Sequence, residues 1–202
     1  MKLFQKLRSL WGMGPVAILH TVLDRVPFQP IQFAIYRRYE FPGYPDPPRQ
    51  PAETMSTRPA DPSDLERLVR CLDKRSIYER RFQAGEHCLV AVVDDAIVGY
   101  EWFSTKNRLY EERYRYPITP PADALYAYDA FTSEAHRGRG VWSQILLAAT
   151  ELMKRERRSR LISHIDYGNE GSMAAHAKVG FRPGGWYLFV YVFGLQILKQ
   201  IS

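Results

Sequence analysis

Cysteine is scarce in this chain of 202 residues, which contains only Cys71 and Cys88. Their spacing is typical neither of a metal site nor of a disulfide framework. We therefore predict two reduced thiols, no bound metal and a cytoplasmic location, because reducing compartments keep isolated thiols reduced. The sequence also lacks internal repeats and low-complexity tracts.

Long hydrophobic runs are missing as well. The apolar run from Trp11 to Leu19 is too short to span a bilayer, and no small-residue cleavage site follows it. Neither a membrane span nor a signal peptide is therefore expected. Residues 1–41 combine basic and apolar side chains and leave two interpretations open. They form either an accessory helical segment docked on the protein or a basic amphipathic segment in peripheral contact with an anionic membrane, at its inner surface.

The net charge of +6 is distributed unevenly. Residues 135–160 alone carry seven basic and two acidic side chains. A basic protein of this kind suggests nucleic-acid binding, but no zinc-finger spacing, aromatic RNA-binding strand or sustained basic helix accompanies the charge. We expect a small anionic ligand instead. Apolar residues make up 46% of the chain, enough for a packed core.

Prolines divide the chain. Five of them fall between residues 42 and 51, where they cannot continue a helix and favour extended geometry. We therefore predict an N-terminal extension and proline-rich linker over residues 1–51 and a folded domain over residues 52–202.

The expected elements of the domain alternate between strand and helix. Residues 53–59 predict a strand, residues 61–72 a helix, and residues 88–104 a hairpin that turns at Asp94 and Asp95. An insertion rich in tyrosine, arginine and proline covers residues 106–124. Residues 186–193 predict a buried strand, followed by a last strand or short helix over residues 195–201.

Residues 125–155 predict an anion site. Leu125 to Thr132 has the composition of a buried strand, and a glycine-interrupted basic loop, Arg137-Gly138-Arg139-Gly140-Val141-Trp142, follows it. The loop opens a helix whose apolar residues recur at steps of three and four. Backbone N–H groups at a helix N-terminus point outward, and the helix dipole adds positive potential there. Glycine lets the backbone approach a phosphate group closely.

The loop resembles that of the GNAT acyltransferases, whose pattern is Arg/Gln-x-x-Gly-x-Gly/Ala. Arg137 and Gly140 fit the pattern, while Trp142 stands where a small residue is usual and must point away from the phosphates. A second signature follows at the expected distance: Asn169-x-x-Ser172-x-x-x-His176-x-Lys178-x-Gly180-Phe181. Histidine replaces the family's usual tyrosine there. The resemblance implies an α/β fold with a GNAT-like mixed central sheet flanked by helices and an N-terminal extension.

The resemblance also implies a reaction and a set of site residues. Acetyl-CoA would be the co-substrate, and an unidentified amine would attack its thioester directly in a ternary complex. His176 would protonate the leaving thiolate and His164 would serve as the base. The residues implied in CoA binding are Phe131, Thr132, Arg137, Gly138, Arg139, Gly140, Val141, Trp142, Ser143, Asn169 and Ser172.

Several alternatives remain open. Glu101, Tyr126, Tyr128, Asp129 or a chain of waters could replace His164 as the base. If the strand over residues 125–132 alternates regularly, Asp129 faces away from Tyr126 and Tyr128. The main alternative function is a catalytically inactive GNAT-like module that binds CoA or a protein partner. Thioester hydrolysis and a membrane-surface enzyme are further alternatives, and the acceptor and oligomeric state are not predicted.

Overall fold

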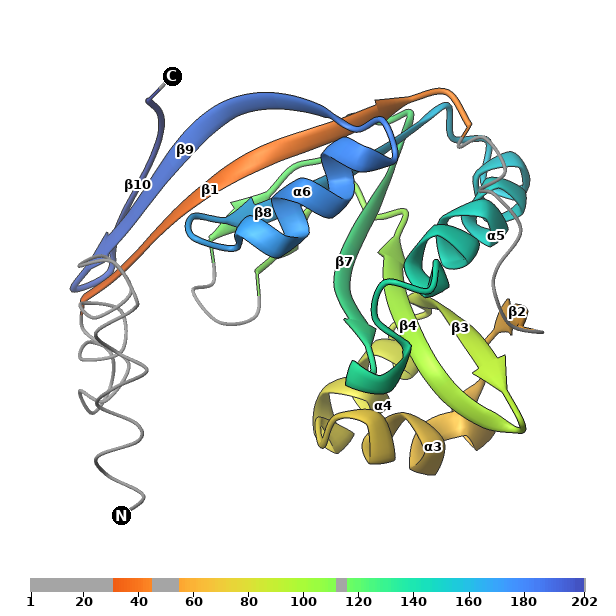
Figure 1. The fold of residues 1–202 in the computed structure, drawn as a ribbon. Coiled ribbons are helices and arrows are strands. Elements are labelled where there is room, and N and C mark those ends of the chain that lie inside the picture. Colours follow the sequence, from red (N-terminus) through yellow and green to blue (C-terminus); the bar gives the residue numbers. More distant parts are fainter. Residues whose placement is uncertain (1–30, 45–54, 112–115, 202) are drawn as a thin grey trace, which may run out of the picture. The chain divides into compact units, whose positions relative to one another are not determined.

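A computed structural model describes residues 31–44, 55–111 and 116–201 of the chain. Contacts divide the protein into two units, which are described separately. Unit 1 comprises Met1–Tyr39, Arg108–Thr119 and His164–Ser202, and unit 2 comprises Glu40–Asn107 and Pro120–Ser163. Both units combine strands with helices (Figure 1), which confirms the predicted α/β class and its mixed sheet.

Unit 2 is built on the strand order β8-β7-β4-β3-β2. The pairs among β2, β3, β4 and β7 are antiparallel, and β7 and β8 are parallel. Its strands are β2 (Ser56–Pro59), β3 (His87–Val93), β4 (Ala96–Ser104), β7 (Ala124–Thr132) and the first part of β8 (Arg160–Asp166). Its helices are η1 (Pro62–Asp64), α3 (Leu65–Cys71), α4 (Arg75–Gln83), η2 (Glu134–His136) and α5 (Val141–Arg155).

Local sequence signals explain two of these boundaries. The Asp61 side chain accepts from the Ser63 backbone N–H at 2.8 Å, and Asp64 accepts from the Asp61 N–H at 3.3 Å. This reciprocal cap begins the helical segment where the sequence predicts it. Asp94 and Asp95 adopt left-handed backbone angles, with φ of 47° and 62°. They form the predicted tight turn between β3 and β4, because two left-handed residues match the twist of an antiparallel pair.

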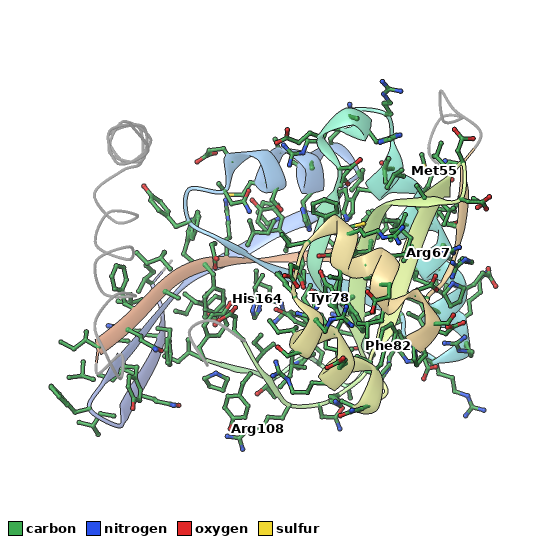
Figure 2. The ribbon with its side chains drawn as sticks, turned by 90° about the horizontal axis from the view of Figure 1, so that it is seen from below. Met55, Arg67, Tyr78, Phe82, Arg108 and His164 are labelled. Atoms are coloured by element: carbon green, nitrogen blue, oxygen red, sulfur yellow. The ribbon has the colours of Figure 1, made fainter. Side chains whose placement is uncertain are left out.

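Helices cover both faces of this sheet (Figure 1). On one face Tyr78 and Phe82 of α4 pack against Trp102, with ring centroids 5.9 and 5.1 Å apart, and Figure 2 labels both α4 residues. On the other face α5 packs against β3 and β4. Its first residue, Val141, lies so close to Gly99 that a Cβ atom there would be 2.5 Å from Val141 Cγ1. Gly99 therefore sets how closely the start of α5 approaches β4.

Unit 1 has the strand order β10-β9-β1-β8. Stacked rings form part of its core: Tyr36 lies between Tyr116 and Tyr187, with centroids 4.4 and 5.3 Å away. The elements are β1 (Ile31–Pro42, of which residues 31–39 lie in this unit), the last part of β8, β9 (Arg182–Val192), β10 (Leu195–Gln200), helix α6 (Glu170–Lys178) and the short pair β5 (Leu109–Tyr110) and β6 (Pro117–Ile118).

The structure corrects the prediction for part of the N-terminal extension. Residues 31–41 are not helical but belong to strand β1, and Ala34, Tyr36 and Tyr39 are buried. The helical interpretation fails here because alternate side chains face a core that only distant residues provide. Residues 1–30 and most of the linker lie outside the described residues, and the boundary at residue 51 stays a prediction. Leu195–Gln200 is a strand, one of the two forms predicted.

Candidate functional site

The predicted anion loop of unit 2 leads directly into a helix of 15 residues. Gly138 and Gly140 have φ of 76° and 81°, the left-handed region in which a side chain is strained. Gly140 is the N-cap of α5, and its carbonyl accepts from the Gln144 N–H at 3.0 Å. The start of α5 therefore has the backbone shape of an anion site, since the first N–H groups of a helix have no acceptor within it.

Hydrogen bonds between residues close in the sequence hold the segment before this loop. The Ser133 hydroxyl lies 2.8 Å from His136 Nδ1, and the Arg137 guanidinium donates to the Thr132 carbonyl at 3.3 Å. The N–H of Arg139 donates to the His136 carbonyl at 3.4 Å. Arg137 is thus engaged with the end of β7, and the amide of Arg139 closes a turn. The amides after Gly140 remain the better candidates for an anion.

Strand β7 changes its pairing halfway along. It pairs with β8 at Ala124, Leu125 and Tyr126, and in the part of the chain that the structure describes this ladder ends there. Its pairing with β4 continues to Thr132 but shifts register beside Glu101. Asp129 has φ of 50°, so an extra residue bulges from the strand at this point. The second half of β7 is consequently partly exposed, with Ala130 the most open residue.

A partly buried ion network surrounds the bulge. The Asp129 carboxylate lies 2.7 Å from Lys74 Nζ and 2.5 Å from Arg81. Burial alone would raise the pKa of Asp129, but the charges of Arg81 and Lys74 outweigh it and hold that pKa below its ordinary value. The Arg81 guanidinium also lies 4.8 Å from the centre of the Tyr128 ring. Asp129 and Tyr128 therefore share Arg81 as a partner on one face, and the strand does not alternate regularly because the bulge interrupts it.

Trp142 and Glu101 form a second buried contact in unit 2. The Trp142 indole N–H donates to Glu101 Oε2 at 3.0 Å, which turns the ring toward β4. Glu101 is 2% exposed. Burial raises its pKa to about 8, while the indole N–H opposes this shift and the charge of Asp129 adds to it. The tryptophan that departs from the family pattern thus has a specific partner in the sheet.

The second group of predicted residues lies in unit 1, around α6. Asn169 caps this helix, its side-chain oxygen accepting from the Ser172 N–H at 3.2 Å. His176 is buried beside Tyr39 and Phe181, and its Nδ1 lies 2.8 Å from the Ser172 carbonyl, which can only accept. Burial lowers the pKa of His176 to about 4, although this hydrogen bond favours the protonated ring. At neutral pH the ring is therefore uncharged and donates its Nδ1 proton to the helix backbone.

His164 belongs to the aromatic core of unit 1. It comes from β8 (Figure 2), and its ring centroid lies 4.5 Å from that of Tyr36 and 6.2 Å from that of Tyr116. Burial, together with the charge of Arg38, lowers the pKa of His164 to about 3. A neutral imidazole can accept a proton, but one with so low a pKa is a weak base.

The structure thus brings the loop, Phe131, Thr132 and Trp142 together in unit 2, and Asn169, Ser172 and His176 together in unit 1. The sequence gives no signal for Lys74 and Arg81, because their partner Asp129 lies 55 and 48 residues away in the chain.

The described residues include no group of three or more histidine, cysteine or acidic side chains placed to hold a metal. None of the described helices is long and apolar enough to cross a membrane.

A family model relates most of this chain to known proteins. The family described as the acetyltransferase (GNAT) family matches residues 52–181, which is more than half of the chain. The protein belongs to this family. A search of curated proteins finds no match.

Solved structures share the fold at low sequence identity. A functionally unknown conserved protein from Staphylococcus epidermidis ATCC 12228 has a TM-score of 0.59 and 13% identity, over 90% of this chain and 68% of that one. Aminoglycoside N-acetyltransferase AAC(6')-Iy in complex with CoA has a TM-score of 0.53 and 18% identity, over 63% and 91%. The same enzyme with the bisubstrate analogue CoA-S-monomethyl-acetylneamine has a TM-score of 0.52 and 18% identity, over 64% and 92%.

Proposed function

We propose that the protein is an N-acetyltransferase that moves an acetyl group from acetyl-CoA to an amine. The observation that carries the proposal is the start of α5, where two left-handed glycines precede a long helix directly after the bulged strand β7. Membership of the acetyltransferase family supports it, as does the CoA bound by a protein of similar fold. The pyrophosphate would bind the amides after Gly140, and the pantetheine arm would lie along the second half of β7.

Acetyl transfer from a thioester to an amine requires stabilisation of the carbonyl oxygen as negative charge develops. In the proposal the backbone N–H near Phe131 supplies this stabilisation, because the pairing of β7 with β8 ends at Tyr126, before this residue. Attack would be direct. Burial raises the pKa of both thiols, so neither Cys71 nor Cys88 is the thiolate that a covalent intermediate needs.

The reaction also needs a base for the amine and an acid for the leaving thiolate. His164 remains the first candidate base, with a water chain as its alternative, since an amine bound partly neutral needs little help. Glu101 is less suited to direct contact with the amine because it is buried and bound to Trp142. Asp129 is bound by two cations, whose charges lower its pKa and make it a poor base. His176 stays the proposed acid for the thiolate.

One observation favours a second candidate function. His176 is neutral and donates to the helix backbone, whereas the proposed acid must donate to the thiolate. A module that binds CoA or a protein partner without catalysis would not need that proton. Release of CoA from acetyl-CoA in the presence of an amine panel, including an aminoglycoside such as the acceptor part of the analogue bound to AAC(6')-Iy, separates the two functions.

Calorimetric titration with acetyl-CoA tests the binding site itself. Gly140→Asp would place a side chain and a negative charge at the α5 N-cap, and we expect the affinity to fall at least tenfold, about 1.4 kcal/mol. Gly85→Asp is the matched control, because Gly85 also has positive φ and open space around it but lies in the turn after α4. Unchanged binding by a folded Gly140→Asp protein, or an equal loss in the control, would contradict the proposed site.

A further inference from the structure

Glu101 is a buried carboxyl for which the proposed reaction has no direct role. It lies on β4 two residues after Gly99, so both side-chain positions face the same side of the sheet. That side is covered by the start of α5, where Val141 contacts Gly99. A carboxyl group buried there is costly unless a partner compensates it.

Two features that the proposed function requires meet at Glu101. The first is the N-terminus of α5, whose second residue, Trp142, donates its indole N–H to Glu101 Oε2 at 3.0 Å. The second is the β7 bulge, because the β4–β7 ladder shifts register at Glu101, between the pairs Tyr100–Phe131 and Trp102–Tyr128. Glu101 therefore binds the first turn of α5 from the position in β4 that lies beside the bulge.

We propose that Glu101 is a positioning residue of the CoA site, which fixes the first turn of α5 by holding Trp142 against β4. The ligand, acetyl-CoA, rests on the proposed function, whereas the effect of Glu101 on the first turn of α5 does not depend on a ligand. The contact also explains how a tryptophan fits a position that is small elsewhere in the family. With its indole drawn into the sheet, Trp142 leaves the amides of the loop open to an anion.

The surroundings of Glu101 make this more than a packing contact. Trp142 from α5 contacts it, Leu89 is its partner in β3, and the charge of Asp129 in β7, which Lys74 and Arg81 bind, acts on it. None of these three residues brings a positive charge to Glu101. Because its folded pKa of about 8 lies above the ordinary 4.5, Glu101 favours the folded state most below pH 4.5, and this contribution is lost as the pH rises through 8.

Three variants and one control test the inference. Glu101→Leu removes the acceptor, Trp142→Phe removes the donor but keeps a ring, and Glu101→Gln keeps a neutral acceptor. Glu151→Gln is the control, because it makes the same carboxyl-to-amide change at an exposed position on α5, where Glu151 pairs with Lys154. Amide hydrogen exchange of the first turn of α5, acetyl-CoA affinity by calorimetry and thermal unfolding are measured for each.

We expect Glu101→Leu and Trp142→Phe to raise the exchange rate of the first-turn amides about fivefold and to weaken acetyl-CoA binding five- to tenfold, about 1.0–1.4 kcal/mol. Glu101→Gln should keep the exchange rate and the affinity within about twofold of the wild-type values, and Glu151→Gln should leave both quantities unchanged. At pH 9 Glu101→Leu should unfold at no lower temperature than the wild type, so a purely structural role would not account for its binding loss.

The outcomes separate this inference from the proposed function. Faster exchange in Glu101→Leu and Trp142→Phe, in a protein whose wild type fails to bind acetyl-CoA, would support the clamp on α5 but refute CoA binding. Exchange rates and affinity equal to those of the wild type in both variants would overturn the inference. A Glu101→Leu protein that does not fold leaves Trp142→Phe to decide, because that variant retains the buried carboxyl and the aromatic ring.

Discussion

Burial and neighbouring charges shift the ionisation of several single residues in this protein. Glu101 and His176 both have pKa values shifted by burial, but in directions that leave each of them neutral near pH 7. Asp129 stays charged because two cations bind it. The protein therefore keeps one carboxylate ionised at the β7 bulge, whereas burial removes the charge from Glu101 and His176.

Substitution of His176 tests the role of a single residue. If it protonates the leaving thiolate, His176→Phe should bind acetyl-CoA within a few-fold of the wild type and lose at least about tenfold in kcat, and His176→Tyr should recover part of the loss. Steady-state assays of CoA release and calorimetry measure the two quantities. Near-normal kcat in the Phe variant would assign His176 to the core of unit 1.

The pH dependence of stability provides an independent check on His176. Its folded pKa of about 4 lies below the ordinary 6.5, so the folded state is penalised as the pH falls from 6.5 toward 4, by roughly 1.4 kcal/mol for each pH unit crossed between these two pKa values. His176→Phe lacks this penalty. Urea unfolding should therefore show a smaller loss of stability between pH 7 and pH 4 in the variant than in the wild type.

Among the helices and strands, the packing of α5 on β4 decides where the glycine loop before α5 lies. Gly99 permits a close approach, since an added Cβ would lie 2.5 Å from Val141 Cγ1 and 3.0 Å from the Phe131 carbonyl. The same glycine therefore adjoins both the start of α5 and the exposed half of β7.

We expect Gly99→Ala to destabilise the protein by about 1–3 kcal/mol in urea unfolding, because the overpacked contact must shift α5 or β7. Acetyl-CoA affinity should fall as well. Gly171→Ala serves as the control: it lies in α6 with open space around it, and an alanine there should stabilise the helix by up to about 1 kcal/mol. Addition of Val141→Ala to Gly99→Ala should restore part of the lost stability, and no restoration would mean that the Phe131 carbonyl dominates the clash.

For the molecule as a whole, β1 changes what is expected of the N-terminal segment. The sequence alone predicts that residues 1–41 are dispensable for CoA binding, because a proline-rich segment separates them from both signatures. The structure instead places residues 31–39 in the strand order of unit 1, with Tyr36 and Tyr39 in its core. Removal of β1 would expose to water the rings that pack on Tyr36 and Tyr39, among them Tyr116, Tyr187 and His176.

We therefore predict that a chain starting at Ala52 is insoluble or strongly destabilised, whereas one starting at Ile31 folds. Thermal unfolding and size-exclusion chromatography compare the two. A stable, CoA-binding protein from Ala52 would contradict the role of β1 and show that residues 1–41 are dispensable. Flotation of the full chain with anionic liposomes, against the chain from Ile31, tests the proposed membrane contact of the first residues.

Local sequence patterns were sufficient to predict the class of fold, the family and the glycine loop that leads into α5. The informative features are the glycines at residues 138 and 140 that permit left-handed backbone, the apolar residues at helical spacing in α5, and the capping box at Asp61. Hydrogen bonds in helices, turns and caps join residues a few positions apart, so a short window contains both partners.

Which residues share a site, by contrast, depended on tertiary contacts. The Glu101–Trp142 hydrogen bond, the Lys74–Asp129–Arg81 network and the pairing of β1 each join segments tens of residues or more apart. The bulge at Asp129 reversed the expected facing of β7, because one extra residue shifts every later side chain to the other face. The pKa values of His164 and His176 also depend on tertiary structure. Distant segments bury each ring and so lower its pKa, and no local pattern records that burial.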